Sequence, residues 1–205
     1  MKVDPLTALL AVSFSAFARD HHRSDDRLVN LRGRWRFSIG DDARRAQPGF
    51  DDSDWSTVHV PSYWEEEGYE DYNGFAGYRR TFSFDGDPNQ ATHLLLGQVD
   101  DVDEVFLNGT KIGNTGNPDD SDRHSGGDSY AQLRGYYFPG SLLKDDNVLA
   151  VRVHNHGGRG GIYDVPLGII SQSRYIDYWE NIRRDRHWHH HGKSLLRTLL
   201  VGDDD

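Results

Sequence analysis

Apolar and polar residues alternate strictly in the first ordered-looking part of the chain. From Leu31 to Ile39 every second residue is apolar or glycine, and arginines or serine stand between them. Because successive strand side chains point to opposite faces, this period of two predicts a half-buried strand with an arginine-rich outer face. Comparable patterns predict further strands, and the full set is 31–39, 56–60, 78–84, 93–98, 104–107, 110–112, 136–138, 148–154 and 162–170.

The connections between these strands are rich in Gly, Pro and Asp. Asn108-Gly109 lies between two short apolar runs, and this dipeptide predicts a tight hairpin because both residues tolerate positive φ. Many short strands joined by such turns predict an antiparallel sandwich or barrel. We therefore expect one all-β domain over residues 27–172.

Two segments depart from the strand pattern. Residues 113–129 form a long polar stretch, and a loop of this length in a compact domain is usually functional or mobile. From residue 173 onward the spacing becomes helical, which predicts a C-terminal helical segment over residues 173–205. The apolar positions with this spacing are Tyr175, Ile176, Trp179, Ile182, Leu195, Leu196, Leu199 and Leu200.

Composition narrows the classes of function. The 205 residues include 33 acidic and 23 basic side chains, giving a net charge of −10. This balance argues against a nucleic-acid partner, which would require a basic surface. The chain has no cysteine, which excludes thiol catalysis, disulfides and cysteine-ligated zinc.

The N-terminus carries a short apolar run. Residues 6–18 are mostly apolar and end in the triplet Ala16-Phe17-Ala18. This run is too short to span a bilayer and fits the apolar region and cleavage site of a secretory signal peptide. We expect a signal peptide over residues 1–18, a secreted or periplasmic protein, and no membrane span in the chain. The alternative is an N-terminal helix packed on the domain.

Several short motifs occur in a defined order between residues 31 and 170. They are LRGRWRF at 31–37, FDDSDW at 50–55, VHVP at 58–61, YNG at 72–74, GYRRTF at 77–82, VDDVDEVFLNG at 99–109, NVLAVRV at 147–153 and GGIY at 160–163. Together they resemble the N-terminal sugar-binding domain of glycoside hydrolase family 2, the β-galactosidase and β-glucuronidase group. The resemblance implies a jelly-roll β-sandwich of the galactose-binding type.

The same resemblance places catalysis elsewhere. In that family the catalytic glutamates belong to a separate (β/α)₈ barrel, which needs about 250 residues, so we expect this chain not to be an enzyme. Its own acidic run, Glu65-Glu66-Glu67 with Glu70 and Asp71, supplies adjacent carboxylates that point apart. Retaining hydrolysis needs two carboxyls about 5 Å apart across a sugar, so this run is interpreted as a solvated loop.

One segment combines the residue types that bind sugars. Aromatic rings offer platforms for the C–H faces of a sugar, and planar polar groups bind its hydroxyls. The candidates are Trp64, Tyr69, Tyr72, Asn73 and Arg80. The resemblance implies that Asn73 reaches toward the sugar. Arg80 shares strand parity with Phe82 and Phe84, so it needs a buried acid or a ligand as partner; both interpretations stay open.

Other candidates follow from the order of the motifs. Arg134 and Tyr136 follow the long loop, and His154 and Tyr163 lie at strand ends; the resemblance places such residues near the ligand. Their alternative role is packing and hydrogen bonding within the domain. The resemblance implies that the aspartates Asp100, Asp101 and Asp103 hold a turn or an ion rather than catalyse.

Metal binding receives little support from the sequence. Residues 119–126 are acidic but lack the Gly and Glu that an EF-hand requires, which leaves a looser structural calcium site or, as the favoured interpretation, a solvated loop. His187, His189, His190 and His191 could bind a transition metal adventitiously. We expect no cofactor.

The sequence leaves three functions open. The leading hypothesis is an exported, non-catalytic carbohydrate-binding module whose ligand is a carbohydrate. A second is a ligand-sensing ectodomain of a larger signalling protein, and a third is an accessory domain of a multidomain glycoside hydrolase. In the last two, the C-terminal helix would contact a partner domain or protein.

Overall fold

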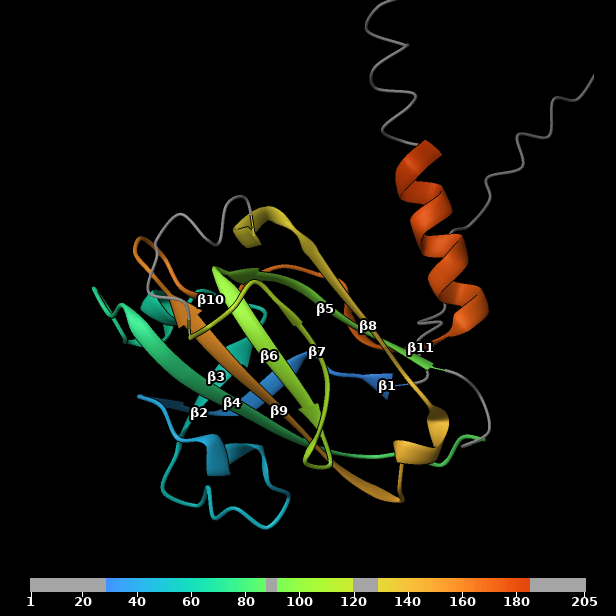
Figure 1. Cartoon of the computed structure of the whole chain (residues 1–205). Helices are drawn as coiled ribbons and strands as arrows, with labels where there is room; N and C mark the ends of the chain where they lie inside the picture. The colour runs from blue at the N-terminus through green and yellow to red at the C-terminus, as the bar shows by residue number, and fades with distance from the viewer. Residues whose placement is uncertain (1–28, 88–91, 120–128, 185–205) are drawn as a thin grey trace, which may run out of the picture.

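The strands of the protein form two antiparallel sheets that face each other. The computed structural model describes residues 29–87, 92–119 and 129–184. Figure 1 shows the two layers, with the chain crossing repeatedly between them. The five-stranded sheet has the order β1-β11-β5-β10, and β8 also pairs with β5. Its strands are β1 (Val29–Asn30), β5 (Thr92–Asp100), β8 (Leu133–Phe138), β10 (Gly161–Ile162) and β11 (Leu167–Ser171).

The second sheet has six strands in the order β3-β2-β4-β9-β6-β7. They are β2 (Gly33–Ile39), β3 (Ser56–Val60), β4 (Gly74–Ser83), β6 (Val102–Leu107), β7 (Thr110–Thr115) and β9 (Asp146–Asn155). Short 3₁₀ turns join them: η1 (Ala43–Ala46), η2 (Trp64–Glu67), η3 (Ser129–Ala131) and η4 (Gly140–Leu142). The predicted all-β sandwich is confirmed.

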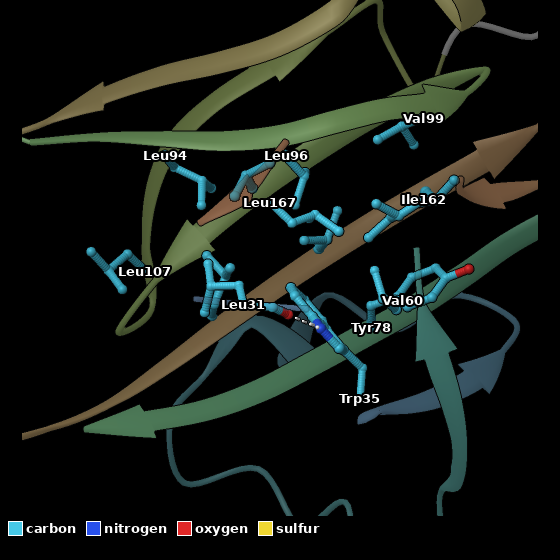
Figure 2. Close-up of a cluster of buried hydrophobic side chains, with 14 of the residues drawn as sticks. Leu31, Trp35, Val60, Tyr78, Leu94, Leu96, Val99, Leu107, Ile162 and Leu167 are labelled. Atoms are coloured by element: carbon cyan, nitrogen blue, oxygen red, sulfur yellow. Dashed lines mark hydrogen bonds between the residues drawn. The ribbon is translucent and has the colours of Figure 1, made fainter. Parts of the chain in front are cut away.

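The core lies between the inner faces of the two sheets. Leu94 and Leu96 of β5 meet Trp35 of β2 and Tyr78 of β4 there (Figure 2). The Trp35 indole N–H donates to the carbonyl of Leu31 at 2.8 Å, so its one polar atom is satisfied inside the core. Burial of such large side chains is the main source of stability for the sandwich.

The alternating pattern located the strands well, with one error. β3 has the predicted bounds, and most other strands extend beyond them. The predicted single strand 162–170 is wrong, because β10 and β11 are separate. Between them the chain crosses a bulge of β5 at Gly97, where a Cβ atom would lie 1.8 Å from the Asp164 carbonyl oxygen.

The hairpin after β6 has the predicted turn. Asn108 and Gly109 have φ of 51° and 83°. The Asn108 side chain is also fully engaged: its amide nitrogen donates to the Leu142 carbonyl and to Asn147 Oδ1, and its oxygen accepts from Val148 N. The turn is therefore anchored to the start of β9 as well as to its own strands.

The predicted bounds of the polar loop, 113–129, are wrong at both ends. Residues up to Thr115 belong to β7, and Ser129 is buried at the start of η3. The register explains the first difference, because Asp103 pairs with Thr115 and extends the ladder that the hairpin begins.

Residues 172–184 are helical, which agrees with the predicted change of period. Figure 1 shows this helix leaving the sandwich beside β11. Tyr175 attaches it by stacking on His93 of β5, with centroids 3.9 Å apart. Ile176, predicted to share the apolar face, is 47% exposed. No described helix is long and apolar enough to cross a membrane.

Candidate functional site

The predicted residue Asn73 lies at one end of the sandwich, where several strands begin or end. Gly74, the first residue of β4, pairs with Asn155, the last residue of β9. The end of β5 reaches the same place, because Asp101 N donates to the His154 carbonyl. Asn73 itself is exposed, and its Oδ1 accepts from Asn155 Nδ2 at 3.4 Å.

An aromatic stack lies beside Asn73. Phe75 and His154 are direct partners across β4 and β9, so their side chains lie on the same face of the sheet. Their rings stack with centroids 4.0 Å apart and 7° between planes. His154 Nδ1 lies 3.0 Å from the Pro118 carbonyl oxygen. Burial, followed by the nearby His156, lowers the pKa of His154 and favours its neutral form.

A second aromatic stack stands at the same end, close enough to Asp100 for the charge of that carboxyl to act on both of its tyrosines. Tyr63 and Tyr163 stack with centroids 4.6 Å apart and 9° between planes. The Arg159 guanidinium carbon is 3.7 Å from the Tyr63 centroid, and one ring face has no room for both groups. Arg159 and Tyr163 therefore cover opposite faces of Tyr63. The hydroxyl of Tyr163 donates to the Tyr130 carbonyl at 2.7 Å.

The carboxyls of Asp100 and Asp101 connect the two stacks. Asp101 Oδ2 accepts from His156 N at 2.9 Å and lies 3.3 Å from His156 Nδ1. The Asp100 carboxyl faces Asp101, and β10 pairs beside it through Gly161. Burial, the hydrogen bond to Asp101 and the Asp101 charge raise the pKa of Asp100 to about 8. Asp100 therefore holds its proton more tightly than an ordinary aspartate does.

Arg134 and Tyr136 support this end from inside the sandwich. Arg134 Nε donates to Asp103 Oδ1 at 2.8 Å, and both side chains are fully buried. The other guanidinium N–H groups donate to four backbone carbonyls, those of Ser129, Gln132, Val99 and Asp101. All five donors of Arg134 thus have protein partners. The Tyr136 hydroxyl donates to Asp103 Oδ2 at 2.6 Å.

Trp64, Tyr69 and Tyr72 hold the segment that carries Asn73. Trp64 is 1% exposed, and its indole N–H donates to the Tyr72 carbonyl at 3.2 Å. Tyr69 packs edge-on against Phe37. The Tyr72 hydroxyl donates to the Phe75 carbonyl and accepts from Gly40 N. These aromatic rings mainly anchor the loop to the core.

Arg80 lies far from Asn73. The two are separated by most of β4, on the order of 20 Å at strand spacing. The Arg80 guanidinium donates to the backbone carbonyl of Arg34, and its Nε is buried without a partner. Of the two partners left open for Arg80, a buried acid is not present among the described residues, where the neighbouring Arg79 instead pairs with Asp52 at 2.7 Å.

The acidic run after Trp64 is partly bound rather than wholly solvated. Glu65 Oε1 accepts from Gly160 N at 3.0 Å, and Glu66 pairs with Arg159. These contacts tie η2 to the glycine-rich segment before β10. Glu65 is therefore not the wholly solvated residue that was predicted, whereas Glu66 remains exposed within its surface pair.

The structure thus brings together Asn73, His154 and Tyr163, supports them with Arg134 and Tyr136, and separates Arg80. Sequence reasoning missed Tyr63, Phe75, His156 and Arg159. These residues are hard to find from the sequence. The pairing of Phe75 with His154, for example, follows only from the register of β4 and β9. The aromatic character of Tyr63 beside Trp64 was the one cue in the sequence.

Some predictions fall outside the described residues. They are the signal peptide at 1–18, the part of the acidic loop from 120 onward, and the histidines at 187 and 189–191. Within the described ranges, no group of three or more His, Asp or Glu side chains is placed to hold a metal ion.

Comparisons with known proteins place the sandwich in a family. No protein-family model matches the chain. The β-galactosidase BoGH2A of Bacteroides ovatus is 33% identical over 160 residues, which cover 71% of this chain and 17% of that protein. The β-glucuronidase of Bacteroides uniformis superposes with a TM-score of 0.50 at 26% identity, over 65% of this chain and 16% of that one.

A β-glucuronidase from glycoside hydrolase family 2 has the same fold, with a TM-score of 0.54 at 17% identity over 65% of this chain and 16% of that one. The chain therefore spans about one sixth of the length of these relatives. The sandwich is a domain of the glycoside hydrolase family 2 type, related to the β-galactosidase and β-glucuronidase group that its motifs resemble.

Proposed function

We propose that this domain binds a carbohydrate, without catalysis, at the end of the sandwich that carries Asn73. The observation that supports this most is the grouping of two aromatic stacks, an exposed asparagine and two carboxyls within one small region. Aromatic faces with a few planar polar groups are the usual composition of a sugar site.

Each part has a role in the proposal. Asn73 is exposed and offers both amide donors to sugar hydroxyls, since its oxygen is the atom that contacts Asn155. Tyr163 has one ring face against Tyr63 and its hydroxyl tied down, which fixes the ring as a rigid platform. His154 is also fixed in place, because its ring contacts both Phe75 and His156 and its Nδ1 lies near the Pro118 carbonyl. Rigid groups bind with a smaller entropic cost.

The non-catalytic part of the proposal rests on the carboxyl geometry. Asp100 and Asp101 face each other and are joined by a hydrogen bond, whereas glycoside hydrolysis uses carboxyls at least about 5 Å apart with the sugar between them. Glu65 and Glu66 are bound to Gly160 and Arg159. The acids at this end therefore shape a binding surface.

Calorimetric titration with the methyl β-glycosides of galactose, glucose and mannose tests this function. We expect one of them to bind, and Asn73→Ala to weaken it about tenfold, or about 1.4 kcal/mol. The matched control is Asn30→Ala on β1, an exposed asparagine away from this end. Indifference to all three sugars, or equal affinity in the Asn73 variant, contradicts the proposal as located here.

A second candidate is an accessory domain within a larger glycoside hydrolase. It is favoured by the short share of each relative that the chain spans and by the helix that leaves the sandwich (Figure 1). In that role the same end would contact a sugar held by another domain. Affinity for free sugars that appears only with the partner domain present would favour this candidate.

We also propose export, as the apolar run at residues 6–18 suggests.

A further inference from the structure

We propose that the Asp100–Asp101 carboxyl pair makes this end of the sandwich selective for uncharged sugars over uronic acids. This inference rests on the proposed carbohydrate-binding function and adds the class of sugar. It concerns the charge that a ligand meets between the two aromatic stacks.

The acids at this end outnumber the cations that are free to bind. Asp100 and Asp101 lie between the stacks, and Glu65 is close enough for its charge to act on Asp100. Glu66 adds a fourth carboxylate, paired with Arg159. A uronic acid would bring a further carboxylate into this group, and like charges placed together repel.

A bound carboxylate is normally matched by an arginine or lysine whose charge is not already offset. Among the described residues at this end, the charge of each arginine is already offset by a carboxylate of the protein. Arg159 is half exposed and pairs with Glu66 through one nitrogen, and Arg134 pairs with Asp103 and uses all its donors inside the sandwich. Arg152 binds three carboxylates, those of Asp41, Glu104 and Asp119.

The histidines do not supply the missing charge at neutral pH. Burial lowers the pKa of His154, so its ring is uncharged. His156 lies against Asp101, which faces its ring and its backbone N–H. Any charge on His156 is therefore balanced by Asp101 before a ligand arrives.

Neutral sugars suit the pair better because a hydroxyl both donates and accepts hydrogen bonds. With one proton on Asp100, the pair offers acceptor oxygens to sugar hydroxyls. A carboxylate can only accept hydrogen bonds, so it gains nothing from these acceptor oxygens and is repelled by their charge. As pH rises past 8, Asp100 becomes charged. Arg134 and Glu65 also face Asp100, and both Tyr63 and Tyr163 stay protonated because their pKa values are raised, chiefly by burial.

The test compares each neutral sugar with its own uronic acid. Methyl β-galactoside and methyl β-galacturonide form one pair, and the glucose and glucuronic acid glycosides form another. We expect the neutral member to bind at least tenfold more tightly at pH 6.5. We expect the ratio of the two affinities to rise further at pH 9. The double variant Asp100→Asn with Asp101→Asn should narrow the ratio at both pH values.

Asp100→Asn alone provides a second route if the double variant does not fold. It removes the carboxyl whose pKa is raised by burial, so the rise in the ratio between pH 6.5 and pH 9 should disappear. The control is Asp145→Asn, an exposed acid at the opposite end of β9, which should leave the ratio unchanged.

The outcomes separate the two proposals. Equal binding of neutral and acidic sugars, or a preference for the uronic acid, overturns the selectivity and leaves carbohydrate binding intact. If the ratio of the affinities for neutral and acidic sugars is the same after both carboxyls are removed, the proposed role of the pair is overturned. Failure of every sugar to bind overturns the proposed function and this inference with it.

Discussion

Asp103 in β6 and Arg134 in β8 form an ion pair of 2.8 Å between the two sheets, and neither side chain is exposed to solvent. Burial raises the pKa of Asp103, while Arg134 and the Tyr136 hydroxyl act in the opposite direction. Charged side chains in the interior of a protein are tolerated only when each is fully paired.

Asp103→Asn should therefore destabilise the fold strongly. It leaves the Arg134 charge buried without its counter-charge, and breaking a buried pair costs about 3–5 kcal/mol. Urea unfolding measures the change. The exposed pair of Asp42 and Arg44 is the control, and Asp42→Asn should have little effect. A small loss at Asp103 would show that backbone carbonyls alone can hold Arg134.

The stability of the protein should depend on the protonation of Asp100. Its pKa rises from the ordinary 3.8 to about 8 on folding, so the folded state binds the proton more tightly than the unfolded chain. Its contribution to stability is complete below pH 4 and is lost as pH rises through 8. Asp100→Asn should be more stable than wild type at pH 8, with no advantage at pH 4.

Thermal unfolding across this pH range tests the Asp100 prediction. The difference between wild type and Asp100→Asn should grow steadily with pH. A constant difference would mean that Asp100 is ionised in the fold at all these pH values.

Gly160 should not accept a side chain. A Cβ atom there would lie 2.0 Å from Trp64 Cζ2, and Trp64 is buried. Gly160→Ala must displace the indole or the loop, and overpacking of this kind costs about 1–3 kcal/mol. Gly157 has open space around it, so Gly157→Ala is the control. Equal urea midpoints for both variants would contradict the close packing.

The helix at residues 172–184 should detach from the sandwich in acid. Its contact includes Tyr175 stacking on His93, whose Nδ1 is buried and has no hydrogen-bond partner among the residues that the structure describes. Burial lowers the pKa of His93, so the contact is stable above pH 6.5 and weakens as pH falls. The near-ultraviolet signal of Trp179, which packs on Tyr175, reports the change.

His93→Phe serves as the control for the helix. It keeps a ring for Tyr175 and removes the titrating group, so the acid transition should disappear. Persistence of the transition in this variant would assign it to another group.

Local patterns predicted the sandwich well because they act through neighbouring residues. The alternation from Leu31 to Ile39 placed β2 on the core, and Asn108-Gly109 set the hairpin. The exception is Ile39, which is the last residue of β2 and is 43% exposed. The period of two predicts on which face of the sheet a side chain lies, but not which element packs against that face.

The site was harder to predict because its contacts join distant segments. Arg79 and Arg80 are adjacent, yet the loop before β3 folds over Arg79 and leaves Arg80 with a backbone carbonyl. Arg134 has the right residue type for a ligand contact, but its five donors are satisfied internally. Only tertiary structure decides between these roles.

The anchored side chain of Asn108 has a consequence for modification of the protein. Asn108-Gly109-Thr110 matches the acceptor pattern for an N-linked glycan. The nitrogen that would carry the glycan already donates to the Leu142 carbonyl and to Asn147 Oδ1. Attachment after folding would replace one of the two hydrogens and so break at least one of these contacts at a tight turn, so this sequon should remain unglycosylated wherever the folded domain meets the modifying enzyme.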